Sequence, residues 1–243
     1  MTKSRKIFYL SFSLLSILFL ILSASIVGRF TISGVEVKDI PETWSVMSLI
    51  LKEKGRNIFS VNKRGIKKEI EDLVYIEKAE VSVKNKIMTV TGITPNNGVL
   101  LYDGERTAFV SEGNKGEVDG NDYCALKSGF LTIKVTPIFY DVILGSDDEK
   151  YTSLMMTLSQ AFESSGLITN AEYDNNKPSI FSGTLTLYLD NIEAVLYIKD
   201  LRKVDRLEEC LEIIKEEYIS SKDRMSERAK EYVLDDSLKV VKR

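Results

Sequence analysis

The first pattern along the chain is a long apolar run without charge. No charged residue occurs from Ile7 to Gly28, where leucine, isoleucine, phenylalanine and valine dominate. A helix over 7–28 would be about 33 Å long at about 1.5 Å per residue, enough to cross a hydrocarbon core of about 30 Å. The pattern therefore predicts a short cytoplasmic tail over 1–6 and a transmembrane helix over 7–28.

Basic residues before this run predict how the chain is oriented. Lys3, Arg5 and Lys6 precede it without an acidic residue, and such a bias places the N-terminus in the cytoplasm and the bulk of the chain outside it. A cleaved signal peptide is the alternative, with residues 23–25 as a small-residue cleavage site. Because the apolar region of a signal peptide spans only roughly 7–15 residues, the longer run favours a retained single-pass anchor.

Residues 29–94 show the periodicity of a small unit that combines helices and strands. Polar and apolar residues alternate over 31–37, as in a strand with one buried face. Pro41 favours the first turn of a helix, and Asn62 favours an N-cap. The predicted order is a strand at 31–37, a helix opened by Pro41 and ended by Gly55, a helix from Asn62, and strands at 77–84 and 86–91 joined by a turn at Asn85. This order predicts helices packed on one face of a sheet.

Residues 95–243 are predicted to form a larger, mixed β-rich domain. Ser146 and Glu149 have the spacing of a capping box, and Asp200 is the expected N-cap of a long final helix. The predicted strands lie at 99–102, 106–110, 131–135, 140–144, 168–173, 183–188 and 193–198, with a loop at 111–122 and a last pair of strands at the C-terminus. The predicted fold class is therefore α+β: a transmembrane helix, a small β-α-α-β-β unit, and a β-rich domain with a long C-terminal helix and a final edge strand.

Composition excludes several kinds of chemistry. The chain has no histidine and a formal net charge of −3, so histidine-based catalysis is excluded and nucleic-acid binding is disfavoured. Cys124 and Cys210 could form a disulfide outside the cytoplasm, but unpaired thiols are favoured because Cys210 lies on an apolar helix face. We predict no catalytic residue, no metal, no cofactor and no small-molecule substrate, and hence a protein that is not an enzyme.

Five short segments follow the apolar run in a characteristic order. They are Ile32–Val37, Gly55–Asn62 (Gly-Arg-Asn-Ile-Phe-Ser-Val-Asn), Ile76–Val83, Leu201–Leu207 and Val240–Arg243. In this order they resemble the first POTRA strand, the linker between the POTRA helices, the second strand, the C-terminal helix and the closing strand of the FtsQ/DivIB family of bacterial cell-division proteins. The resemblance divides the chain into a POTRA-like domain over 29–94 and an FtsQ/DivIB-type β-domain over 95–243.

The resemblance implies a non-enzymatic scaffold of the divisome, anchored in the inner (cytoplasmic) membrane at the division septum. Members of the family recruit and regulate septal cell-wall synthesis by binding FtsB-like and FtsL-like coiled-coil membrane proteins, and a partner segment adds as a strand beside the last strand. The corresponding partner-binding residues here are Ser237, Leu238, Lys239, Val240 and Val241. For this strand, the alternative is a solvated edge that only completes the sheet.

Two other functions remain open at this point. A POTRA-bearing module of envelope assembly or secretion would have the same small domain, and its depletion would block export instead of septation. An anchored cell-wall enzyme is less favoured, because it requires a cleft with perturbed carboxylates.

Overall fold

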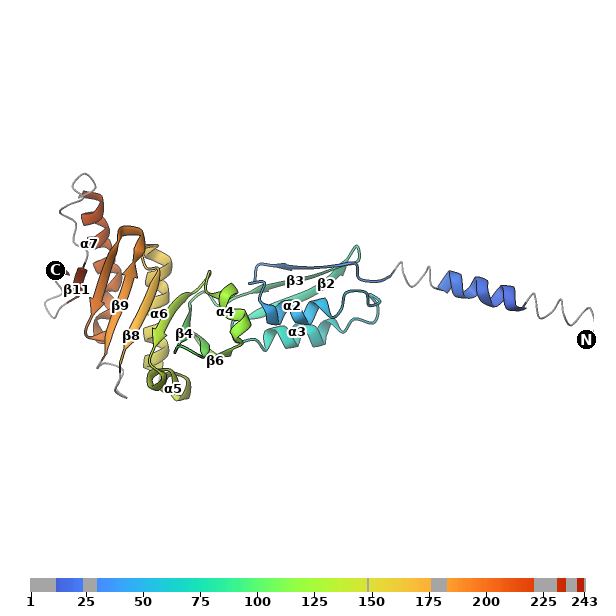
Figure 1. Cartoon of the computed structure of the whole chain (residues 1–243), viewed down its shortest axis with the longest axis horizontal. Helices are drawn as coiled ribbons and strands as arrows, with labels where there is room; N and C mark the ends of the chain where they lie inside the picture. Colours follow the sequence, from blue (N-terminus) through green and yellow to red (C-terminus); the bar gives the residue numbers. More distant parts are fainter. Residues whose placement is uncertain are drawn as a thin grey trace, which may run out of the picture.

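The structure is a computed structural model that describes residues 12–23, 30–147, 149–175, 183–220, 231–234 and 240–242. The described chain is α+β and has two sheets, one of three strands and one of nine. Figure 1 shows an elongated arrangement, in which the N-terminal helix lies at one end, the three-stranded unit follows, and the nine-stranded sheet forms the other end.

The predicted transmembrane helix over 7–28 is contradicted by the structure. Helix is described over residues 12–23. Within the described ranges, no helix is both long and apolar enough to cross a membrane; residues 7–11 and 24–28 lie outside those ranges. The single-pass inner-membrane topology rested on this helix, and the predicted membrane localisation is withdrawn with it.

The three-stranded unit has the element order that its periodicity predicts. Its elements are β1 (Gly34–Lys38), α2 (Trp44–Leu51), α3 (Lys63–Glu71), β2 (Lys78–Lys84) and β3 (Ile87–Ile93). β3 is central, parallel to β1 and antiparallel to β2. The hydroxyl of Thr43 accepts from the Val46 N–H and caps α2, so this helix begins later than Pro41. Asn62 caps α3, as predicted.

The nine-stranded sheet takes up the rest of the described chain. Its strand order is β12-β11-β10-β9-β8-β7-β4-β5-β6, and three neighbouring pairs are parallel: β4 with β7, β7 with β8, and β10 with β11. The strands are β4 (Gly98–Tyr102), β5 (Thr107–Ser111), β6 (Asn114–Val118), β7 (Leu131–Val135), β8 (Asn170–Asp174), β9 (Thr184–Leu189), β10 (Ala194–Ile198), β11 (Glu231–Leu234) and β12 (Val240–Lys242). The helices are α4 (Gly120–Leu126), α5 (Pro137–Gly145), α6 (Glu149–Ser165) and α7 (Leu207–Ser220).

One predicted strand of this domain is a helix. Residues 140–144 lie in α5, which begins at Pro137 after the cap residue Thr136. The Thr136 hydroxyl accepts from the Phe139 N–H at 3.4 Å, and proline at the first helical position lacks the N–H that would otherwise be unpaired. The local cap therefore outweighs the β-branched residues that suggested a strand.

Two further boundaries differ from the prediction. The segment 111–122, predicted as a loop, contains β6 and the start of α4, whose N-cap is Asp119. Asp200 caps a 3-10 turn over Leu201–Arg206, and α7 begins only after that turn. In both places a capping aspartate starts helical structure where the sequence alone placed a different boundary.

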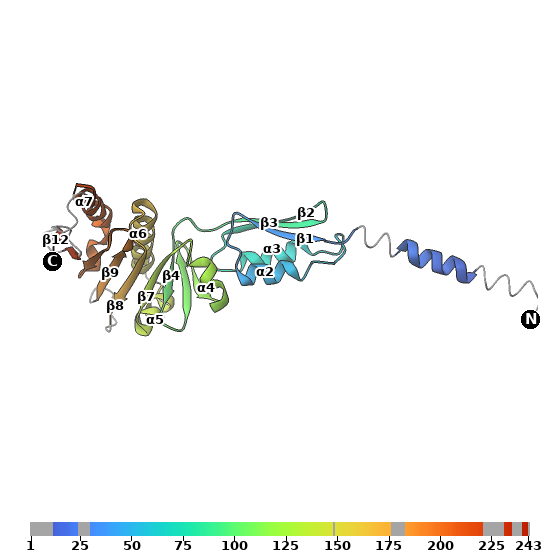
Figure 2. The same cartoon turned by 45° about the horizontal axis from the view of Figure 1, so that its top comes forward.

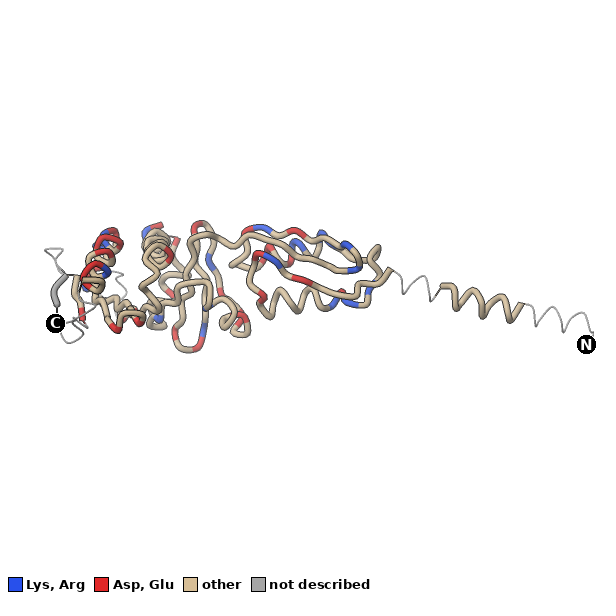
Figure 3. Tube along the Cα trace, turned by 90° about the horizontal axis from the view of Figure 1, so that it is seen from above, with Lys and Arg blue, Asp and Glu red and all other residues tan. Residues whose placement is uncertain are grey.

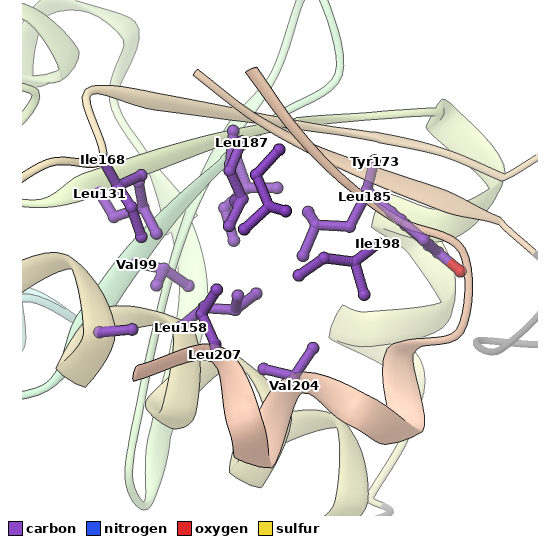
Figure 4. Packing of buried hydrophobic residues seen from close by; sticks show 14 of the residues in the cluster. Val99, Leu131, Leu158, Ile168, Tyr173, Leu185, Leu187, Ile198, Val204 and Leu207 are labelled. Atoms are coloured by element: carbon purple, nitrogen blue, oxygen red, sulfur yellow. The ribbon is translucent and has the colours of Figure 1, made fainter. Parts of the chain in front are cut away.

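The main core lies between the large sheet and the helices α6 and α7. Figure 4 shows Leu158 of α6 and Leu207 of α7 on the side of the core opposite Leu185 and Leu187 of β9. Cys210 is buried in the same core as an unpaired thiol, and Cys124 is also unpaired but exposed. The favoured prediction of unpaired thiols is therefore confirmed.

β4 and β5 are buried on both faces. Val99 and Leu101 of β4 lie in the main core, whereas Leu100, between them, lies in a second core with residues of the three-stranded unit. Phe109 of β5 also belongs to this second core. Strands covered on both faces have continuous apolar sequences instead of alternation, as both of these strands do.

A buried hydrogen-bond network, here called the joint, connects the three-stranded unit to α4. The Tyr75 hydroxyl donates to Asp122 Oδ2 at 2.7 Å and lies 2.9 Å from Thr43 Oγ1. The Ser45 N–H donates to Asp122 Oδ1 at 2.8 Å. Burial raises the pKa of the Tyr75 hydroxyl, so this group keeps its proton and continues to donate to the carboxylate.

Replacing the donor of the joint should destabilise the chain. Tyr75→Phe keeps the ring but leaves a carboxylate oxygen of the buried Asp122 without that partner, which lowers the free energy of unfolding by about 1–3 kcal/mol. Urea unfolding measures the change. Tyr102→Phe is the matched control, because its exposed hydroxyl donates to the Gly104 carbonyl and its loss changes stability by about 0.5 kcal/mol or less. Equal effects of the two variants would contradict a buried network.

Candidate partner-binding edge and sheet face

The predicted partner-binding strand reaches an edge of the large sheet. β12 is the outermost of the nine strands and pairs antiparallel with β11, so that Val241 lies opposite Val233. The structure thus places two of the predicted residues, Val240 and Val241, at this edge. The other three predicted residues, Ser237, Leu238 and Lys239, lie outside the described residues.

The backbone of β12 has the chemistry that strand addition requires. Backbone N–H and C=O groups alternate in direction along a strand, so one set pairs with β11 and the other points outward. A partner segment in extended conformation pairs with that outward set. The neighbouring strand β11 is anchored in the main core, where its Tyr232 and Leu234 are buried. β12 therefore pairs with a strand of fixed position.

The opposite edge of the sheet, β6, is in contact with the three-stranded unit. Asn114 Nδ2 donates to the Val74 carbonyl at 2.9 Å. A Cβ atom on Gly116 would lie only 2.7 Å from Val74 Cγ1, so the two segments approach closely there. Of the two edges of the described sheet, β12 is therefore the better candidate for a partner strand.

The face of the large sheet away from α6 and α7 is polar and aromatic. Figure 2 shows both helices on the same side of β8 and β9. Along these strands, buried apolar residues alternate with less buried polar ones. The polar and aromatic residues of β7, β8 and β9 include Thr132, Lys134, Glu172, Thr186 and Tyr188.

An ion pair lies in the middle of this face. Lys134 Nζ and Glu172 Oε1 are 2.9 Å apart, and the Tyr188 hydroxyl donates to Glu172 Oε2 at 3.1 Å. The hydrogen bond from Lys134 is the main cause that lowers the pKa of the Glu172 carboxyl below its ordinary value, and the bond from Tyr188 adds to it. Both oxygens of Glu172 are therefore engaged.

Two adjoining cavities lie along this face, here together called the outer groove. The first, of about 320 Å³, lies between Tyr123 of α4 and strands β4, β7, β8 and β9. The second, of about 490 Å³, extends toward Pro137 at the start of α5. Lys134 and Glu172 line both cavities. The ring of Tyr123 stacks on that of Tyr102 at 5.4 Å between centroids, which fixes one end of the groove.

Thr132 lines the first cavity, and its side-chain hydroxyl forms no hydrogen bond among the described residues. The residue is 7% exposed, and its hydroxyl has no hydrogen-bond partner among the described residues. A buried hydroxyl without a partner is destabilising by roughly 1–3 kcal/mol. Buried hydroxyls without a partner are uncommon in folded proteins. The side chain of Thr132 therefore makes the fold less stable than an apolar side chain of the same shape would.

Compared with protein-family models and with curated proteins, the chain matches none. Among the described residues, no group of three or more cysteine, aspartate or glutamate side chains is arranged to hold a metal ion.

Sequence reasoning missed the outer groove and a basic end of the molecule. The alternation in β9 was visible in the sequence. The start of α4, which forms one wall of the groove, fell in the predicted loop 111–122, and no element was predicted over the rest of this helix. The basic end forms where two segments that are distant in sequence, those around Arg56 and Lys86, meet the start of β1. The backbone carbonyls of Arg56 and Lys86 accept hydrogen bonds there from the N–H groups of Ile32 and Ser33. Figure 3 shows basic residues at this end of the three-stranded unit and acidic residues along α7.

Removing the unused hydroxyl of Thr132 should not destabilise the protein. Thr132→Val replaces a buried hydroxyl that has no partner in the described structure, so we expect the free energy of unfolding to stay the same or rise by about 1 kcal/mol. Thr43→Val is the matched comparison, because that hydroxyl caps α2 and contacts Tyr75, and its loss lowers stability by about 1–2 kcal/mol. Urea unfolding of both variants checks the pair, and a similar loss in both would contradict the assignment.

The contribution of Glu172 to stability should depend on pH. Its pKa is lowered in the folded state, so its stabilising effect is present above the pKa of the unfolded chain and is lost as the pH falls through the lower folded value. The difference in unfolding free energy between the wild type and Glu172→Gln should therefore shrink between about pH 7 and about pH 3. In a Lys134→Met background this pH dependence should be weaker, and an unchanged dependence would exclude Lys134 as the main cause.

Proposed function

We propose that this chain is a non-enzymatic scaffold of bacterial cell division that binds FtsB-like and FtsL-like coiled-coil partners by strand addition at β12. The observation that supports this most is the position of β12, which is the outermost strand and belongs to the segment that resembles the closing strand of FtsQ/DivIB proteins. The proposal does not include a membrane span, because no helix among the described residues is long and apolar enough to cross a membrane.

The order of elements also supports this proposal. A β-α-α-β-β unit precedes a larger sheet that ends in a long helix and an edge strand, which is the layout that the resemblance implies. In such a complex the partner's backbone supplies most of the affinity, and its alternate side chains select the register. Binding would extend the nine-stranded sheet by one strand.

Proline substitutions at two adjacent positions test strand addition directly. Because N–H groups alternate in direction along a strand, one of Val240 and Val241 directs its N–H toward β11 and the other directs it outward. Val240→Pro and Val241→Pro should therefore differ: one weakens β11–β12 pairing, and the other removes an outward donor and leaves the fold intact. Pull-down of a purified FtsB-like protein from the same bacterium, together with urea unfolding, measures both effects.

The expected result is that the variant with wild-type stability loses partner binding about tenfold or more, because proline both removes a donor and obstructs the added strand. Wild-type binding by both variants would exclude β12 as the binding edge. Loss of binding only in the destabilised variant would also contradict strand addition, because the outward backbone groups would then be dispensable.

Depletion in the cell tests the wider function. Cells depleted of this protein should grow but fail to divide, and so lengthen, while protein export continues. A block in export with normal division would contradict the cell-division proposal and favour a role in secretion or envelope assembly. Phase-contrast microscopy and the secretion of a reporter protein measure the two outcomes in the same culture.

A further inference from the structure

The outer groove carries more negative than positive charge. Its charged lining residues are Lys134, Glu172, Asp174 and Asp190. Lys134 pairs with Glu172 at 2.9 Å, which leaves the carboxylates of Asp174 and Asp190. Neither of these two has an ion-pair partner among the described residues, although Asp190 accepts a hydrogen bond from the Thr169 hydroxyl at 2.7 Å. The groove therefore presents the exposed carboxylates of Asp174 and Asp190, whereas the charges of Lys134 and Glu172 neutralise each other.

The two carboxylates stand at opposite ends of the groove. Asp174 is the last residue of β8 and lies opposite Thr184 of β9, whereas Asp190 directly follows the other end of β9. Six residues of strand separate the levels of Thr184 and Asp190, about 20 Å at about 3.3 Å per residue. An extended peptide that runs along β9 would match this distance with cationic residues about six positions apart.

Aromatic rings flank the path between the carboxylates. Tyr188 lies in the groove, and the stacked pair Tyr102 and Tyr123 borders it. Tyrosine rings give a rigid contact surface with little loss of conformational entropy, and their faces attract cationic side chains. A long basic side chain, which has an apolar stem and a charged end, suits such a lining better than an acidic one.

We propose that the outer groove binds an extended basic peptide segment of a partner protein, with two lysine or arginine side chains about six residues apart that reach Asp174 and Asp190. This surface lies on the face of the sheet, away from the β12 edge, so it would be a second binding site. It stands independently of the cell-division proposal, because it rests on the charges, distances and cavities of β7, β8 and β9. An acidic or uncharged segment would leave both carboxylates unpaired.

Labelled synthetic peptides test this proposal with the full chain. Three peptides share a neutral Gly/Ser/Thr sequence and differ in two residues: arginines six positions apart, arginines two positions apart, or glutamates six positions apart. Fluorescence anisotropy at low salt should give the widely spaced arginine peptide the highest affinity. Its advantage over the closely spaced peptide should be about threefold to fivefold, the size of one exposed ion pair.

Variants of the two carboxylates complete the test. Asp174→Asn and Asp190→Asn should each lower the affinity for the widely spaced peptide about threefold to fivefold, and the double variant about tenfold or more, since distant sites add. Glu112→Gln is the control, because Glu112 lines a separate cavity beside α6, and it should leave binding unchanged. Thermal unfolding should show that all four variants keep the wild-type fold.

Three outcomes would overturn the proposal. The first is equal affinity for the two arginine spacings, which would indicate non-specific attraction. The second is a loss in Glu112→Gln as large as in the groove variants. The third is tighter binding of the glutamate peptide, which would assign the groove to an acidic partner through Lys134.

Discussion

The burial of β4 and β5 on both faces is the constraint on which the rest of the structure depends. One face of these strands belongs to the core beneath α6, and Leu100 and Phe109 on the other face belong to the core of the three-stranded unit. The two sheets therefore cannot separate without exposing the face of β4 and β5 that carries Leu100 and Phe109, together with the apolar surface of the three-stranded unit packed on it, which is unfavourable by roughly 25 cal/mol per Å². A linker without such burial would let the units move independently.

The hydrogen bonds of the joint fix the orientation of the three-stranded unit relative to α4, which the apolar contact alone does not. Apolar burial is not directional, whereas Asp122 receives hydrogen bonds from both Tyr75 and the backbone of Ser45. A different orientation of the two units would leave that buried carboxylate without partners, which is more costly than the bonds are stabilising. The network therefore selects one arrangement among those that bury similar apolar area.

Periodicity predicted the elements with one buried face well, and missed those shaped by local caps or by distant contacts. The β-α-α-β-β order, the Asn62 cap and the alternation in β9 followed from residues close in sequence. Residues 140–144 are helical because Thr136 and Pro137 start a helix. The sequence of α4 is polar and has no clear helical periodicity, and its Asp122 and Tyr123 contact residues that are distant along the chain. Charge count and length predicted a membrane span that the described helix does not form. The edge position of β12 was implied by resemblance, but the outer groove depends on pairings between strands far apart in the chain.

The rigid connection through β4 and β5 also bears on how a scaffold would act. β12 lies at the end of the large sheet that is far from the three-stranded unit (Figure 2), and the strands of the large sheet are paired in one continuous order from β12 to β6. A partner strand added at β12 would therefore take a fixed position relative to the basic end of the three-stranded unit. The outer groove lies between these ends on the face that α6 and α7 leave open. Ligands at the edge and at the face would both be held by the same continuous nine-stranded sheet, so each would have a defined orientation relative to the other.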